Sequence, residues 1–194
     1  MTGDKDDIVP RAELFATQAH ACQQRKYTGE PYIVHPIEVG RLVREAGGTD
    51  AMVAAALLHD VVEDCGVRLE ELSELFGGEV AALVGWLTDV SKPEDGNRAV
   101  RKAMDRAHIA LAPADAQTVK LADLISNSST IMEYGGGFAR VYIREKALLL
   151  EVLTRGDRGL WQRAKAIVDK ALGSGEPDVE KTLVSETDGG RDRD

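Results

Sequence analysis

The stretch AMVAAALLHDVVED (residues 51–64) decides the fold of this chain. Its first half, from Ala51 to Leu58, is wholly apolar, and an imidazole and three carboxylates follow at once. A buried helix that ends in such groups leaves charge that hydrocarbon does not stabilise. A metal ion bound by the histidine and a carboxylate is the simplest compensation. The stretch therefore predicts a central buried helix over residues 50–64 that ends in a metal site.

Length and composition indicate a single helical domain. The chain has 194 residues, of which 43% are hydrophobic and only 5% aromatic, with Ala, Leu and Val supplying most of the apolar content. The net charge of -9 argues against nucleic acid as a partner, because phosphate affinity of that kind depends on clustered Lys and Arg. A site for a small phosphorylated ligand must therefore be locally basic.

The cysteines and the apolar runs indicate where the protein works. Cys22 and Cys65 form no CxxC pair, and the sequence shows no signal peptide, so both are expected to be reduced thiols in a cytoplasmic protein. The longest apolar runs fall short of the roughly 20 residues that a membrane span needs, so no membrane partner is expected. The sequence does not determine the oligomeric state, and it is compatible with a homo-oligomer.

Helical periodicity, interrupted by Gly, Pro and capping residues, predicts an all-α fold of about nine helices. The residue before a proline is restricted to extended conformations, so His35 is expected just outside a helix that runs from Pro36 to Ala46, after a briefly extended YIV triplet. The other helices are expected at residues 10–24, 50–64, 68–76, 79–88, 98–111, 113–134, 138–153 and 158–172.

The C-terminal segment differs in composition from the rest of the chain. Residues 173–194 are rich in Gly, Ser, Asp and Glu and carry few apolar side chains, so they bury too little surface to offset the entropy of ordering. The sequence predicts a domain over residues 1–172 and a disordered acidic tail over residues 173–194.

The spacing of the polar groups after Leu58 suggests two roles. His59 and Asp60 are neighbours that can chelate one ion, whereas Glu63 and Asp64 stand one turn further, where they can act on a water. The alternative is that the acidic pair is a solvated helix end and that His59 is an ordinary core histidine.

His35 and Asp123 weaken that alternative, because each stands in its own apolar stretch, YIVHPI and VKLAD. Two histidines and two aspartates without a thiolate suit one divalent ion of manganese, iron, zinc or magnesium. The donor types alone do not choose among these ions.

Five motifs in order resemble the HD-domain superfamily. They are AHACQQRK (19–26), GEPYIVHPI (29–37), AALLHDVVED (55–64), FGGEVAALV (76–84) and VKLADLISN (119–127). More narrowly, the chain resembles the hydrolase domain of RelA/SpoT-type alarmone enzymes and their short stand-alone relatives, from about residue 12 to residue 153. The resemblance implies a single HD-domain helical bundle with a metal site in its core cleft.

The resemblance also implies a reaction and a set of roles. The reaction is hydrolysis of the 3′-pyrophosphate of guanosine 3′,5′-bis(diphosphate) (ppGpp), or of its pentaphosphate analogue, to GDP or GTP and pyrophosphate. Manganese is favoured over zinc on this ground alone. The implied metal ligands are His35, His59, Asp60 and Asp123, and the implied catalytic pair is Glu63 and Asp64.

Five further residues match positions near the nucleotide in the resembled family, namely Arg25, Lys26, Asn127, Thr130 and Tyr142. Each has a simpler reading. The Arg–Lys pair suits a solvated helix end, the Asn and Thr suit helix capping, and the Tyr suits a core aromatic. Leu124 departs from the family, which usually has a basic residue there, so either the phosphate arrangement differs or this side chain turns outward.

Two other functions compete with alarmone hydrolysis. One is a metal-dependent phosphatase acting on another nucleotide, such as NADPH at its 2′-phosphate or a deoxynucleotide. The other is a non-catalytic module that binds the alarmone through a degenerate site. The intact pair of Glu63 and Asp64 argues against a pure binding module, which has no evident need for it.

Overall fold

The structure is a computed structural model that describes residues 7–134 and 136–173. Within these ranges the chain folds into ten α-helices and one 3-10 turn, without a regular strand. The expected acidic tail lies outside the described residues, apart from Gly173, which ends the last helix. The elements are α1 (Ile8–Ala19), α2 (Val34–Glu45), α3 (Asp50–Leu58), α4 (Val61–Cys65), α5 (Leu69–Phe76), α6 (Gly78–Leu87), η1 (Pro93–Asp95), α7 (Arg98–Ala110), α8 (Ala114–Tyr134), α9 (Gly136–Leu150) and α10 (Arg158–Gly173).

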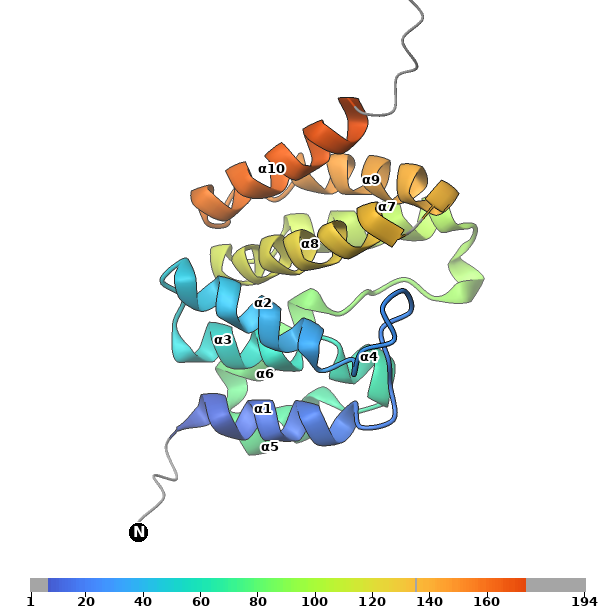
Figure 1. Cartoon of the computed structure of the whole chain (residues 1–194). Coiled ribbons are helices and arrows are strands. Elements are labelled where there is room, and N and C mark those ends of the chain that lie inside the picture. Colours follow the sequence, from blue (N-terminus) through green and yellow to red (C-terminus); the bar gives the residue numbers. More distant parts are fainter. Residues whose placement is uncertain (1–6, 135, 174–194) are drawn as a thin grey trace, which may run out of the picture.

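The helices stack in layers, with α9 and α10 at one end, α7 and α8 next to them, and α1 and α5 at the other end (Figure 1). The apolar helix α3 packs on α1, α2, α6 and α8. All seven of its residues from Met52 to Leu58 are buried. Thr49 caps its first turn, since its Oγ1 accepts a hydrogen bond from the backbone N of Met52 at 3.2 Å. The sequence prediction of a central buried helix is confirmed.

The helix expected over residues 50–64 is interrupted at His59 and Asp60, which separate α3 from α4. The Nδ1 atom of His59 lies 2.8 Å from the carbonyl oxygen of Ala56 and supplies the donor that a last-turn carbonyl otherwise lacks. The carbonyl of Asp60 then accepts from the backbone N of Asp64 at 2.8 Å and opens α4. The other expected helices each match one observed helix, with shifted ends.

The first helix is shorter than predicted and ends at Ala19 rather than at residue 24. The helix ends there because backbone groups of the residues that follow it form hydrogen bonds across a loop. Arg25 donates from its backbone N to the carbonyl of Glu30 at 2.8 Å, and Tyr32 donates to the carbonyl of Gln23 at 3.0 Å. This closed loop carries the basic pair at residues 25 and 26.

The predicted position of His35 outside a helix is wrong, and so is the extended triplet before it. Helix α2 begins at Val34, and the backbone N of His35 bonds to the carbonyl of Tyr32 at 3.0 Å in the preceding turn. First-turn N–H groups have no acceptor within the helix, so Pro36 costs no hydrogen bond there. His35 is therefore held by a helix.

Leu124 lies in α8 and is fully buried in the core, so it does not turn outward. That alternative from the sequence is wrong, and residue 124 contributes packing. In the part of the chain that the structure describes, no helix combines the length and the apolar character that a membrane span requires.

Candidate metal centre

Three parts of the fold bring four side chains into a ring. Helix α2 supplies His35, the α3–α4 junction supplies His59 and Asp60, and α8 supplies Asp123. The Nε2 atom of His35 lies 3.4 Å from Oδ1 of Asp123 and 3.8 Å from Oδ2 of Asp60. The Nε2 atom of His59 lies 3.1 Å from the same Asp60 oxygen and 3.8 Å from the Asp123 oxygen. Ligands held about 2.1 Å from one ion lie roughly 3.0–3.5 Å apart, so these distances are close to those of a metal site.

The hydrogen bonds of the two imidazoles fix which nitrogen faces the ring. The carbonyl oxygen of Ala56 can only accept, so Nδ1 of His59 carries the proton. The Nδ1 atom of His35 lies 2.9 Å from Oγ of Ser126, and that hydroxyl donates to Oε2 of Glu38 at 2.6 Å. The Ser126 oxygen therefore accepts from His35. Both Nε2 atoms are left with a lone pair directed at the ring, as metal-binding histidines require.

The same two Nε2 atoms are buried and have no hydrogen-bond partner among the described residues. Atoms of His35, His59 and Asp123 all lie within 4.8 Å of one another, and all three residues are buried. Buried acceptors without a donor are costly, and a divalent cation would satisfy them. The residues present therefore fit a metal ion with mixed nitrogen and oxygen ligands.

The two carboxylates of the ring are held by neighbours. The Tyr32 hydroxyl donates to Oδ2 of Asp60 at 2.6 Å, and Nδ2 of Asn127 donates to Oδ1 of Asp123 at 2.6 Å. Lys120 lies 3.1 Å from the other Asp123 oxygen. Burial acts to raise the pKa of Asp123, but the charge of Lys120 opposes it, and the pKa stays well below its usual value. This carboxylate is therefore ionised.

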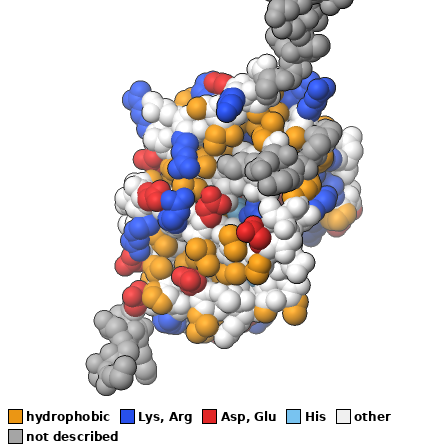
Figure 2. Space-filling model, in the orientation of Figure 1, with side chains coloured by type: hydrophobic (Ala, Val, Ile, Leu, Met, Phe, Trp, Pro, Cys, Tyr) orange, Lys and Arg blue, Asp and Glu red, His pale blue; other side chains and the backbone are white. Residues whose placement is uncertain are grey.

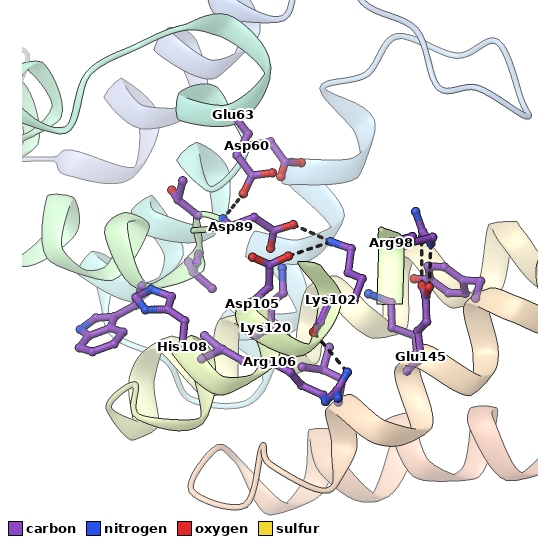
Figure 3. Close-up of a pocket in the computed structure, with 17 residues that line it drawn as sticks. Asp60, Glu63, Asp89, Arg98, Lys102, Asp105, Arg106, His108, Lys120 and Glu145 are labelled. Carbon is purple, nitrogen blue, oxygen red and sulfur yellow. Dashed lines mark hydrogen bonds and ion pairs between the residues drawn. The ribbon is translucent and has the colours of Figure 1, made fainter. Parts of the chain in front are cut away.

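The acidic pair on α4 occupies two different surroundings. Oε1 of Glu63 accepts from the backbone N of Asp89 at 2.6 Å, and Glu63 faces a cavity together with Asp60 (Figure 3). Burial is the main cause that raises the pKa of Glu63. Burial and the charge of Asp60 raise the pKa of Asp64, while the hydroxyl of Tyr32 opposes the rise. The two carboxyl groups thus lie in different surroundings.

Two pockets that share no lining residue adjoin the ring. The larger, a cavity of about 270 Å³, contains Asp60, Glu63, Lys120 and Tyr142 in its wall. The smaller, of about 140 Å³, reaches the ring through Tyr32 and the amide that holds Asp123, and it is lined by Arg25, Lys26, Tyr27, Tyr32, Asn127, Thr130 and Ile131.

Four of the five predicted substrate residues line the smaller pocket, where Nη2 of Arg25 donates to Oγ1 of Thr130 at 3.1 Å. Tyr142 is separate from them and lines the larger cavity. On the face shown in Figure 2, acidic side chains gather at the centre above a patch of apolar ones. The lining of the smaller pocket contains Arg25 and Lys26 and no carboxylate, whereas the larger cavity is lined by five basic and five acidic side chains.

Sequence reasoning missed several residues that support the ring. Ser126 and Glu38 stand three residues after Asp123 and His35, on the helix face of each ligand, so the i+3 spacing was a usable signal. Tyr32 lies in a turn and carried no periodic signal. The bond between its hydroxyl and the ring becomes evident only from the folded chain.

A helical bundle that gathers two histidines and two aspartates in its core defines a class of α-helical metal-binding domains. The chain belongs to the HD domain family, whose model matches residues 12–131. HD domains are metal-dependent, in keeping with the cluster found here.

Curated and solved relatives agree with this assignment. The chain is 36% identical over 181 residues to a probable guanosine-3′,5′-bis(diphosphate) 3′-pyrophosphohydrolase of Synechocystis sp., covering 92% of this chain and 24% of that protein. It is 38% identical over 126 residues to the corresponding protein of Aquifex aeolicus, covering 63% and 18%. A solved metazoan ortholog of SpoT, described as hydrolysing ppGpp, superposes with a TM-score of 0.76 at 27% identity, covering 84% of this chain and 94% of that one. The chain therefore spans about a quarter or less of the length of these curated relatives.

Proposed function

We propose that this chain hydrolyses the 3′-pyrophosphate of ppGpp and of its pentaphosphate analogue. The observation that carries the proposal is the ring of His35, His59, Asp60 and Asp123, with two unsatisfied Nε2 atoms, beside a cavity that Glu63 enters. The names of the relatives from Synechocystis and Aquifex and the description of the metazoan ortholog support this substrate.

Manganese is our proposed ion, bound by these four side chains. Two imidazole nitrogens and two carboxylate oxygens suit a borderline to hard divalent ion, and manganese is among those that accept such a set. When bound, the ion lowers the pKa of its water and polarises a phosphoryl oxygen.

Two carboxylates beside the ring then act on the attacking water. Glu63, held by the backbone of Asp89, is oriented toward the cavity and accepts a proton from the attacking water. Asp64, beside Tyr32, orients that water or relays its proton. Because burial raises the pKa values of both groups, each is a better proton acceptor than a solvated carboxylate.

The smaller pocket is our proposed site for the nucleoside half of the substrate. Arg25 and Lys26 supply positive charge or a guanidinium plane that stacks on the base. Asn127 and Thr130 offer polar contacts to the ribose, and Tyr32 forms part of the wall. Tyr142 is proposed to meet the phosphates instead, because it lines the other cavity.

The test is product identification. Manganese-loaded protein is incubated with ppGpp, and released pyrophosphate and GDP are quantified for the wild type, Asp64→Asn, Glu63→Gln and a control, Glu70→Gln, at an exposed position of α5. We expect at least a hundredfold loss of kcat in each α4 variant and none in the control. No pyrophosphate release by the wild type refutes the proposal. A higher kcat/KM on NADPH or a deoxynucleotide reassigns the substrate, and unaltered turnover in Asp64→Asn refutes the role of Asp64.

A further inference from the structure

The larger cavity is lined by five basic side chains and by five acidic ones, so its basic groups are largely matched by carboxylates of the protein. It begins at Asp60 and Glu63, beside the metal ring, and extends to α7 and α9 (Figure 3). Five basic side chains line it, and four of them have partners within the protein. These are Arg98 with both oxygens of Glu145, Lys102 with Asp89 and Asp105, Lys120 with Asp123, and Arg106 with the carbonyl of Lys102.

The fifth cation, Lys146 of α9, differs from the other four. Among the residues that the structure describes, no carboxylate or carbonyl oxygen forms an ion pair or hydrogen bond with it. Its Nζ atom lies over the ring of Tyr142, 4.8 Å from the centroid. Burial lowers the pKa of Lys146 to about 8, although the charge of Asp123 opposes the shift. The cavity therefore holds a buried ammonium that makes no direct ion pair or hydrogen bond to a carboxylate among the described residues.

Tyr142 adds a hydrogen-bond donor to the same wall. Its hydroxyl is buried near that of Ser128, and neither oxygen has any other hydrogen-bond partner within the described part of the chain. Burial and the negative charge of Asp123 raise the pKa of Tyr142, so the hydroxyl keeps its proton at neutral pH. An ammonium without an ion pair beside a phenol that keeps its proton matches the needs of a phosphate oxygen.

The position of the cavity also suits a phosphate chain. The nucleoside pocket around Arg25 and this cavity share no lining residue, yet both reach the metal ring. A nucleotide whose scissile phosphate lies at the ring would direct its nucleoside into one pocket and its distal phosphate into the other. The distal phosphate would then approach Lys146.

We propose that Lys146 and Tyr142 form a subsite for the distal phosphate of a pyrophosphate ester, and that Lys146 makes the site prefer such esters over phosphate monoesters. The inference rests on the proposed function for the position of the scissile bond. A monoester places its single phosphate at the ring and leaves Lys146 unpaired, so it gains nothing from this side chain.

Inorganic pyrophosphate and orthophosphate are the probes that separate the two positions. Their dissociation constants are measured by titration calorimetry on manganese-loaded wild type, Lys146→Met, Lys146→Arg and Lys165→Met. Lys165→Met is the control, because it removes the same charge from an exposed pair with Asp169 on α10. All variants are compared at equal metal occupancy, so binding of either anion to the ion itself cancels.

We expect Lys146→Met to weaken pyrophosphate binding about tenfold or more, the usual effect of losing a hydrogen bond between charged groups. Its orthophosphate affinity should stay within twofold of the wild type. Lys146→Arg should restore pyrophosphate binding to within threefold, and Lys165→Met should match the wild type. Pyrophosphate binding unchanged in Lys146→Met overturns the proposal, and so does an equal loss for both anions.

Turnover supplies an independent measurement. The ratio of kcat/KM for ppGpp over that for guanosine 5′-diphosphate 3′-monophosphate should fall about tenfold in Lys146→Met. A wild type that hydrolyses neither nucleotide refutes the proposed function, and the pyrophosphate titrations still decide the subsite. A wild type that hydrolyses ppGpp with the same ratio as Lys146→Met keeps the function and overturns the selectivity.

Discussion

The Nε2 atom of His59 lies 3.1 Å from the Oδ2 atom of Asp60, although the two residues are consecutive in the chain. Consecutive side chains of a continuous α-helix point about 100° apart and diverge. Both residues keep right-handed helical backbone angles at the junction of α3 and α4, so their side-chain torsions bring the two groups to one point. The bond from His59 to the carbonyl of Ala56 fixes the interruption and also sets the tautomer of the ring. One local feature thus ends the buried helix and builds half of the metal centre.

Manganese should stabilise this protein through His59. We expect the midpoint of thermal unfolding to rise when chelator is replaced by manganese, because an ion that binds only the folded state adds about 2.7 kcal/mol at a hundred times its dissociation constant. His59→Ala should lose this rise. His108→Ala is the control, since that imidazole stacks on Trp86 outside the ring. An equal manganese effect in His59→Ala, measured by scanning calorimetry, would show that the ion binds elsewhere.

Ser126 should tune metal affinity without contacting the ion. Its Oγ accepts from Nδ1 of His35 and donates to Glu38, so Ser126→Ala leaves the imidazole free to rotate or change tautomer. Loss of such a partner weakens metal binding by about tenfold to a hundredfold. Ser73→Ala, at an exposed position of α5, should leave the affinity unchanged. A competition titration with a chromophoric chelator gives both affinities, and equal values would contradict the role of Ser126.

Lys146 should make stability depend on pH in the alkaline range. Its pKa is about 8 in the folded protein, whereas an unfolded chain restores it to about 10.4. Between these values the unfolded state binds the proton that the folded state has released, so the free energy of unfolding rises with pH. Lys146→Met should remove this contribution. Urea unfolding of the metal-free wild type and variant between pH 7.5 and pH 10 checks it, and parallel curves would contradict the expectation.

Apolar periodicity was sufficient to predict the architecture. The residues Met52–Leu58, and Val119, Leu121 and Ala122 of α8, are buried as expected, because a helix with such a face has to pack against other helices. Helix ends were harder to place. The sequence placed His35 outside α2 because Pro36 follows it, whereas the structure accommodates the proline within the first turn. Local rules do not distinguish a proline that precedes a helix from one that stands in its first turn.

The candidate site likewise contains residues that could be predicted from the sequence and one that could not. The ring of His35, His59, Asp60 and Asp123 could be predicted because its members stand in separate apolar stretches that have to meet in one core. Lys146 could not be predicted, since basic residues are common on helices. Its significance depends on the absence of a partner across the cavity among the described residues, and that requires the folded structure.

Gly156 should be indispensable for docking the last helix on α8. A Cβ atom at this position would lie 2.8 Å from Cδ1 of Leu121 and 3.0 Å from backbone atoms of Gln117 and Thr118. Hydrogen bonds already fix the backbone on either side. The backbone N of Arg155 donates to Oε1 of Gln117, and the backbone N of Asp157 donates to Oγ1 of Thr118, each at 2.9 Å. The loop therefore has no room to move away.

We expect Gly156→Ala to lower the free energy of unfolding by about 1–3 kcal/mol, the usual cost of overpacking a close contact. Gly78→Ala is the matched control, because a Cβ there meets no atom within 4 Å at the start of α6. That change should leave stability equal or slightly higher, since alanine has less entropy to lose on folding. Chemical denaturation of both variants gives the comparison. Equal stability of Gly156→Ala and the wild type would mean that α10 is not docked on α8 through this close approach.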